Sequence, residues 1–233
     1  MKALLKTLSI VGVLATGITG AQAADTTWTF DGSNMTTTGW HYGNTLTKTV
    51  NGSTVTINSF SDSLWGAGGP VHLAKAARYS GGLGVTGIGD SQHTTDNYSG
   101  TDMLLFDFGS AVNLAGIDIG YVSSGYNSDV SVAAFDSLAG TDNSSWGTVL
   151  NNAIFKTSFA DVENNPITTI ATEARYWLIG AYNSVFGGDS ESGFDKFKIL
   201  ALHTNDPVDV PAPATALLML LGLGLVGLRR RQK

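Results

Sequence analysis

The chain has 233 residues, with 19 acidic and 13 basic side chains, a formal net charge of −6 and no cysteine. The absence of cysteine excludes disulfide bonds, thiol catalysis and cysteine-ligated zinc. The acidic balance argues against nucleic acid as a partner, because contacts to phosphates need a basic face.

Residues 1–23 are predicted to be a secretory signal peptide. Lys2 and Lys6 precede an apolar stretch from Leu8 to Ile18. The small residues Ala21 and Ala23 then form the small-x-small pattern that signal peptidase cleaves, so we expect the mature chain to begin after residue 23. An uncleaved N-terminal anchor is the alternative interpretation.

Residues 24–206 are predicted to form one all-β extracellular domain. Short runs rich in Val, Ile, Thr and aromatic residues alternate with the turn residues Gly, Asn, Asp and Ser. This pattern is typical of an antiparallel β-sandwich, and a jelly-roll-like arrangement is the expected variety. The expected strands are Thr26–Phe30, Thr45–Val50, Thr54–Phe60, Met103–Phe108, Leu114–Val122, Val130–Phe135, Tyr176–Tyr182 and Phe194–His203.

Two local features refine this prediction. Asn51-Gly52 lies between two expected strands and predicts a two-residue hairpin turn, because both central positions of a type I′ turn need a positive φ. Helix is expected only in two short segments, Val71–Tyr79 and Val149–Val162.

Polar residues gather in a loop that enters a strongly apolar strand. Asp96, Asn97 and Asp102, with Asp90 and His93 just upstream, could offer oxygen ligands to Ca²⁺. The alternative is that these side chains only stabilise turns by hydrogen bonding to nearby backbone amides. No other cofactor is predicted.

Four aromatic residues in or beside loops rich in Gly, Ser and Asn are candidates for binding carbohydrate. They are Trp40, Trp65, Tyr98 and Trp146. Aromatic rings can stack on the apolar face of a sugar while amide and carboxylate neighbours bind its hydroxyls. The alternative is that these rings cap the ends of the core.

No motif for catalysis is present. The sequence lacks the Gly-x-Ser-x-Gly, His-Glu-x-x-His and P-loop patterns. A glycoside hydrolase would need two carboxylates that meet in the fold, and the sequence singles out no such pair. We therefore expect the protein not to be an enzyme, with a secreted polysaccharide hydrolase as a remaining alternative.

Residues 207–233 form a distinct tail. It consists of Val210, Pro211, Ala212 and Pro213, an apolar run from residue 214 to residue 228, and the cluster Arg229, Arg230 and Arg231. The run predicts a short transmembrane helix, below the roughly 20 residues that a bilayer core prefers, with the arginines in the cytoplasm. The expected mature region, from residue 24 to about Val210, contains seven basic and 19 acidic residues, a net charge of −12.

The tail resembles the sorting signal of PEP-CTERM proteins, in which a Val-Pro-Glu-Pro motif precedes a short helix and an arginine cluster. Ala212 stands where that family usually has Glu. The body is also similar to a group of such proteins, in the segments Gly82–Val85 and His93–Asn97. The resemblance implies a Gram-negative source, cleavage by signal peptidase and exosortase, a transient inner-membrane precursor and a final place at the cell surface or outside the cell.

The same resemblance associates the protein with exopolysaccharide. We therefore expect a structural or adhesive role in a biofilm or extracellular matrix. The first alternative is a lectin-like module, with or without Ca²⁺, that binds extracellular polysaccharide. The hydrolase is the second.

Overall fold

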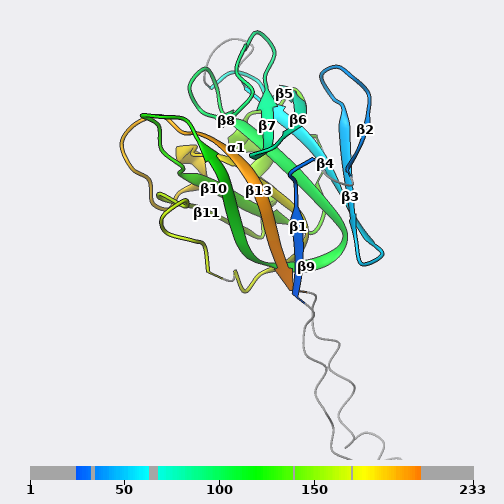
Figure 1. The fold of residues 1–233 in the computed structure, drawn as a ribbon. Coiled ribbons are helices and arrows are strands. Elements are labelled where there is room, and N and C mark those ends of the chain that lie inside the picture. Colours follow the sequence, from blue (N-terminus) through cyan, green and yellow to red (C-terminus); the bar gives the residue numbers. More distant parts are fainter. Residues whose placement is uncertain (1–24, 33–34, 63–67, 139, 169, 206–233) are drawn as a thin grey trace, which may run out of the picture. The chain divides into compact units, whose positions relative to one another are not determined.

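Almost all regular structure in the domain is antiparallel β-sheet (Figure 1). The computed structural model describes residues 25–32, 35–62, 68–138, 140–168 and 170–205. The strands are β1 (Asp25–Thr29), β2 (Met35–Thr38), β3 (Thr45–Val50), β4 (Ser53–Ser61), β5 (His72–Leu73), β6 (Lys75–Tyr79), β7 (Gly82–Thr86), β8 (Thr95–Asp96), β9 (Asp102–Val122), β10 (Val130–Phe135), β11 (Phe155–Phe159), β12 (Glu173–Ala181) and β13 (Lys196–Asn205).

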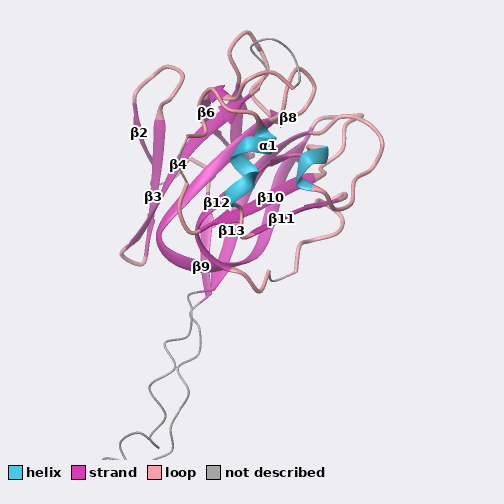
Figure 2. Cartoon of the chain, turned by 180° about the vertical axis from the view of Figure 1, so that it is seen from behind, coloured by secondary structure: helices cyan, strands magenta, loops and turns pink. Residues whose placement is uncertain are grey.

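Helix is confined to short segments beside the strands (Figure 2). These are α1 (Trp146–Val149) and the 3₁₀ turns Leu150–Asn152 and Ser184–Phe186. In the part of the chain that the structure describes, no helix is long and apolar enough to cross a membrane. The predicted signal peptide and the predicted sorting helix lie outside the described residues.

The 21-residue strand β9 organises the sheet. Its first half pairs with β4 and β12, and its second half pairs mainly with β13. Gly109, at the change between the two halves, has a φ of 76°, which favours glycine. The sequence predicted two strands here, and the structure has one continuous strand that passes through this glycine.

The sheet buries a large core on one of its faces. One cluster of buried side chains draws on strands from β1 to β13 and includes Trp28, Ile57, Phe106, Trp177 and Phe197. A second cluster on the other face of the sheet contains Trp146 of α1. The strands are hydrogen-bonded into one 13-stranded sheet, which confirms the predicted antiparallel β class; the two-sheet sandwich stays a prediction.

The Asn51-Gly52 prediction is confirmed. Val50 pairs with Ser53 across a two-residue turn, and the φ values of Asn51 and Gly52 are 51° and 85°. The two helix predictions are wrong in most of their length. The Val71–Tyr79 segment forms β5 and β6, because pairing with β4 and β7 supplies backbone partners that outweigh a modest helix propensity.

The second expected helix shows the same effect. Of the segment Val149–Val162, only its first residue belongs to α1 and the next three form a 3₁₀ turn. Residues Phe155–Phe159 form β11, which pairs with β10. Tertiary pairing therefore decided the structure of both segments.

Candidate functional site

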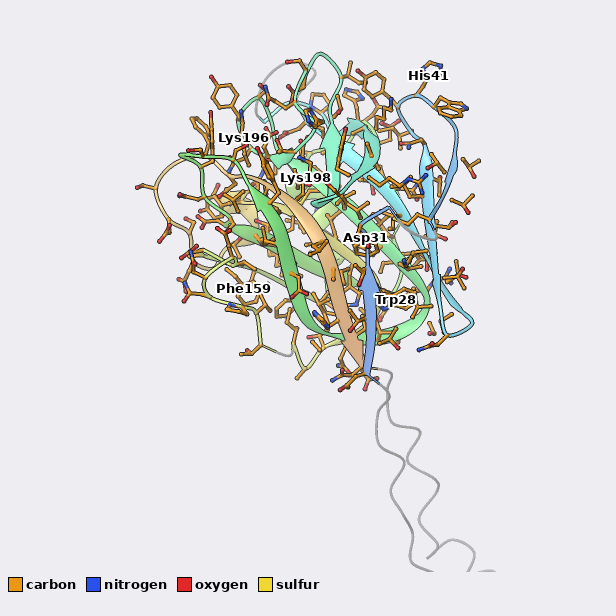
Figure 3. The ribbon with its side chains drawn as sticks, viewed as in Figure 1. Trp28, Asp31, His41, Phe159, Lys196 and Lys198 are labelled. Carbon is orange, nitrogen blue, oxygen red and sulfur yellow. The ribbon has the colours of Figure 1, made fainter. Side chains whose placement is uncertain are left out.

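The start of β13 places two lysines on the outer face of the sheet. Lys196 and Lys198 alternate with Phe197 and Ile199, whose side chains are fully buried in the core. Successive side chains on a strand point to opposite faces, so the two lysines share the face away from that core. They lie about 7 Å apart along the strand, and Figure 3 shows them at neighbouring positions.

Lys196 lies between two tyrosine rings. Its Nζ is 4.3 Å from the centroid of the Tyr98 ring and 4.5 Å from that of Tyr126, and it donates a 3.4 Å hydrogen bond to Oε1 of Gln92. The edge of Phe194 packs on Tyr98 with a centroid separation of 5.2 Å. Lys196 is only 6% exposed, so its ammonium group is largely desolvated, the condition in which cation–π contacts are strongest.

Lys198 repeats the arrangement with a second pair of rings. Its Nζ is 4.9 Å from the ring centroid of Tyr79 and 4.3 Å from that of Tyr121. Burial lowers the pKa of Lys198, and the neighbouring Tyr121 partly offsets this. Tyr79 also packs against His93 at 5.0 Å between ring centroids. These side chains surround a hollow of about 500 Å³, lined by Tyr79, Ser80, Gly81, His93, Gly120, Tyr121 and Lys198.

Together these residues form what we call the lysine–tyrosine surface. Its members are Tyr79, Tyr98, Tyr121, Tyr126, Phe194, Lys196 and Lys198. Tyr98, Tyr121 and Phe194 remain 52%, 45% and 49% exposed, although each packs against other side chains. A row of half-exposed rings held in fixed orientations can stack on an apolar ligand face without ordering flexible side chains.

Close backbone packing supports this surface from below. Gly82 and Gly84 of β7 have no room for a side chain: an added Cβ would overlap the carbonyl oxygen of Ile199 at Gly82 and that of His93 at Gly84. The Gly-Leu-Gly-Val segment therefore lets β7 approach both β13 and the loop that carries His93. It positions the rings and does not itself form a binding motif.

The structure places the four predicted carbohydrate residues differently. Tyr98 belongs to the lysine–tyrosine surface. Trp40 is 84% exposed, in the loop between β2 and β3. Trp146 is 4% exposed and packs in the second core cluster. Trp65 lies outside the described residues.

Of the members of the lysine–tyrosine surface, the sequence predicted only Tyr98 as a binding residue. Tyr79 and Tyr121 lie within predicted helix and strand segments, and no binding role was predicted for either lysine. The available signal was the alternation of Lys196 and Lys198 with apolar residues, which predicts two lysines on one strand face. Nothing in the sequence indicates which rings would cover them.

The predicted cation-binding residues are brought together only in part. Carboxylate oxygens of Asp90, Asp96 and Asp102 all lie within 4.8 Å of one another. Asp96 and Asp102 are buried, whereas Asp90 is partly exposed. Asp96 accepts hydrogen bonds from Oγ1 of Thr94 at 2.9 Å and from the backbone amide of Tyr98 at 3.1 Å.

The environment of this acidic cluster disfavours negative charge. Burial raises the pKa of Asp96 to about 6, with a smaller contribution from the charge of Asp90, while Lys196 acts in the opposite direction. Burial, followed by the charge of Asp96, also raises the pKa of Asp102 well above its usual range.

Asn97, the third predicted ligand, makes other contacts. Its Nδ2 donates to Oδ2 of Asp195 at 2.7 Å, and its Oδ1 accepts from the backbone amide of Asp195 at 2.8 Å. These two hydrogen bonds fix the loop that begins at Asn97 to the residue before β13. Burial raises the pKa of Asp195 to about 7, and the charge of Asp129 adds to this effect. Asp90 therefore stands in the cluster where Asn97 was expected.

The comparison with protein families identifies the tail. A family model described as the PEP-CTERM protein-sorting motif matches residues 209–232, which include Val210, Pro213 and Arg229 to Arg231. The chain therefore carries a PEP-CTERM sorting motif, as predicted. This motif implies processing by exosortase and export to the cell surface or the extracellular space.

The match covers only the tail. The motif implies an exosortase-targeted, secreted surface protein, and the described domain is mainly antiparallel β-sheet. No curated protein and no solved structure matches the chain.

Proposed function

We propose that the domain is a structural or adhesive protein that binds polysaccharide in a biofilm or extracellular matrix through the lysine–tyrosine surface. One observation carries this proposal: Tyr98, Tyr121 and Phe194 are about half exposed yet held in place by packing. Such rings lose little conformational entropy on binding, and stacking on sugar rings uses their apolar faces.

The charge distribution favours a neutral polysaccharide. The mature region has a net charge of −12, which repels a polyanion. Lys196 and Lys198 are each only 6% exposed and face tyrosine rings, so their ammonium groups are poorly placed to pair with ligand carboxylates or sulfates. Binding should therefore depend little on salt concentration.

A non-catalytic role is part of the proposal. Asp96 and Asp102 have a raised pKa, a property that carboxylic acids in glycosidases share. They are 0% and 1% exposed, however, so a substrate cannot reach them without a rearrangement of the loop. We propose that the domain binds polysaccharide without cleaving it.

A lectin-like module is the second candidate. The hollow of about 500 Å³ between Tyr79 and Tyr121 could receive a single sugar residue, with His93 and Lys198 as polar neighbours. This function differs from adhesion along a chain because a free monosaccharide should compete for the site.

The remaining parts of the proposal concern the scaffold and the route of export. A jelly-roll-like sandwich is our interpretation of the sheet. Signal peptidase would remove residues 1–23, and the tail from residue 207 would hold the precursor in the inner membrane until exosortase acts. The exported domain would then display its aromatic rings to the surrounding matrix.

Affinity electrophoresis of the exported protein tests the binding proposal. The protein is recovered from outside the native cells and run through gels that contain exopolysaccharide from the same cells, or a neutral glucan, or a polyuronate. We expect retardation by the neutral polymer, unchanged between low and high salt. The double variant Tyr98→Ala and Tyr121→Ala should lose about tenfold in affinity, at about 0.5–1.5 kcal/mol for each stacked ring.

Tyr42→Ala is the matched control, because Tyr42 is 47% exposed but does not belong to the lysine–tyrosine surface. Equal retardation of the wild type and the double variant would contradict the proposal. Competition by a monosaccharide would favour the lectin-like function, and release of reducing ends would favour a hydrolase.

A further inference from the structure

Three carboxylates meet at the base of the loop that carries Tyr98, and among the described residues none of them has a basic group in salt-bridge contact. Oxygens of Asp90, Asp96 and Asp102 lie within 4.8 Å of one another. Among the described residues, ion pairs within 4.0 Å involve other acidic side chains: Asp107, Asp118 and Asp142. The carboxylates of the cluster therefore face one another without a basic group in salt-bridge contact.

A second observation indicates a ligand for this cluster. Asp102 is 1% exposed, and its Oδ1 has no hydrogen-bond partner. Its other oxygen accepts a 3.4 Å hydrogen bond from the backbone amide of Asp96, so the carboxylate is turned toward the cluster. A buried carboxylate oxygen without a partner is costly unless something binds it.

We propose that Asp90, Asp96 and Asp102 form a Ca²⁺ site. All three ligands are hard oxygen donors, which suit Ca²⁺ and Mg²⁺ rather than zinc. Ligands at 2.3–2.6 Å from Ca²⁺ lie at most about 5 Å apart, and the oxygens of the cluster lie within this span, since all are within 4.8 Å of one another. Mg²⁺ gives up its water reluctantly and usually binds only one or two carboxylates, so three carboxylates suit Ca²⁺ better.

The site would stabilise the base of the loop that carries Tyr98. Asp96 accepts a hydrogen bond from the backbone amide of Tyr98 and lies opposite Lys196 in the pairing of β8 with β13. A bound cation would favour the ionised carboxylates and remove their mutual repulsion. The Ca²⁺ site does not depend on whether the lysine–tyrosine surface binds polysaccharide.

Thermal unfolding and terbium luminescence test the site on the full chain, purified in a mild detergent. At neutral pH, Ca²⁺ at about 100 times its Kd should raise Tm by roughly 5–10 °C relative to EDTA. Mg²⁺ should have a smaller effect. Tb³⁺ should give luminescence sensitised by nearby tyrosines, and Ca²⁺ should displace it.

Asp102→Asn should abolish both signals, while its Tm in EDTA should equal or exceed that of the wild type because one buried charge is gone. Asp90→Asn changes a partly exposed residue, so it should fold even if the first variant does not, and it should weaken Ca²⁺ at least tenfold. Asp136→Asn, at an exposed position, is the control.

Three results would overturn the proposal. The first is an equal Tm in Ca²⁺ and EDTA together with no terbium signal. The second is an unchanged Ca²⁺ affinity in both Asp102→Asn and Asp90→Asn, which would place any binding elsewhere. The third is loss of Ca²⁺ binding in Asp136→Asn to the same degree.

Discussion

Asp96 of β8 stands directly opposite Lys196 of β13 in the antiparallel pairing of the two strands. The acidic cluster and the lysine–tyrosine surface therefore share one strand pair. The charge of Lys196 favours the ionised form of Asp96, and the amide of Tyr98 donates a hydrogen bond to the same carboxylate. A substitution of Asp96 or Lys196 should therefore change the electrostatic environment of the other residue.

Replacing Lys196 with methionine should destabilise the domain by about 1–2 kcal/mol. The variant keeps the apolar stem but removes the cation from between Tyr98 and Tyr126, and a desolvated cation–π contact is worth up to about 2 kcal/mol. Lys196→Arg should lose less, because a guanidinium also packs on aromatic rings. Urea unfolding measures both effects.

Lys75→Met is the matched control, because Lys75 is exposed on β6. It should change the free energy of unfolding by less than about 0.5 kcal/mol. An equal loss in Lys75→Met and Lys196→Met would show that the rings give Lys196 no special stabilisation.

Without divalent cations, the domain should lose stability as the pH rises from about 4 to 7. The pKa values of Asp96 and Asp195 are raised from 3.8 to about 6 and about 7. In that window the folded state binds more protons than the unfolded state, so unfolding releases protons and a higher pH favours it. Each group contributes up to about 1.4 kcal/mol for each pH unit between its unfolded and folded pKa values. The free energy of unfolding should therefore fall by roughly 3–6 kcal/mol in total.

Urea unfolding in EDTA between pH 4.5 and 8 measures this slope. Nearby charges affect the two pKa values: Asp90, Asp102 and Lys196 lie around Asp96, and Asp129 lies beside Asp195. Asp96→Asn removes one of the two titrating groups, and Asp136→Asn, at an exposed position, is its matched control. The first should make the slope smaller without abolishing it, because Asp195 still titrates, and the second should leave it unchanged. A flat wild-type profile would contradict the raised pKa values.

Gly84→Ala should destabilise the domain by several kcal/mol. The added methyl would overlap the carbonyl oxygen of His93, a backbone atom that cannot move aside cheaply. Gly147→Ala is the control, since its Cβ would meet only a side-chain oxygen at 3.8 Å and alanine favours the helix there. Equal melting temperatures for the two variants would contradict close packing at β7.

The sequence predicted the features that depend on short-range rules. The Asn51-Gly52 hairpin follows from turn geometry, and the short spacing of Asp96 and Asp102 already placed them in one loop. Features that depend on distant pairing were not accessible. The segment Val71–Tyr79 has helix-forming residues but receives its hydrogen bonds from β4 and β7.

The same limit applies to the candidate site. The lysines of β13 meet rings that lie about 70 to 120 positions earlier in the chain, brought close by strand pairing. The spacing of Asn97 also predicts a cation ligand. Its partner is instead Asp195, almost 100 residues away, and only the fold shows that contact.

Asn44→Ala should cost about 2–4 kcal/mol. Asn44 is 3% exposed and imitates a strand partner: its Nδ2 donates to the carbonyl of Ala76 at 2.8 Å, and its Oδ1 accepts from the Ala76 amide at 2.9 Å. Truncation leaves two buried backbone groups without partners. Asn58→Ala, which removes one partly buried hydrogen bond to Thr45, should cost about 1 kcal/mol.

Asn44→Asp separates hydrogen bonding from packing. An ionised aspartate keeps the acceptor but loses the donor and faces the carbonyl of Ala76, so its loss of stability relative to the wild type should be larger at pH 7 than at pH 4. Urea unfolding at both values measures the difference. A fully stable Asn44→Asp at pH 7 would show that this contact contributes little.

The sorting motif predicts the mass of the exported protein. With exosortase present, the protein recovered outside the cells should begin near residue 24 and end near Pro213, inside the motif at residues 209–232. It should therefore lack the cluster from Arg229 to Arg231. Without exosortase, the intact tail should be retained in the membrane fraction. Intact-mass spectrometry distinguishes the two forms.

Replacing all three arginines with asparagine should reduce processing, because the basic cluster orients the tail by keeping it on the cytoplasmic side. Trp40→Ala, a change on the exposed surface of the domain, is the control and should be processed normally. Retention of the arginine cluster and of the protein in the membrane fraction, equally with and without exosortase, would show that the motif does not direct cleavage. The tail would then act only as an anchor, and the lysine–tyrosine surface would have to meet its ligand at the membrane.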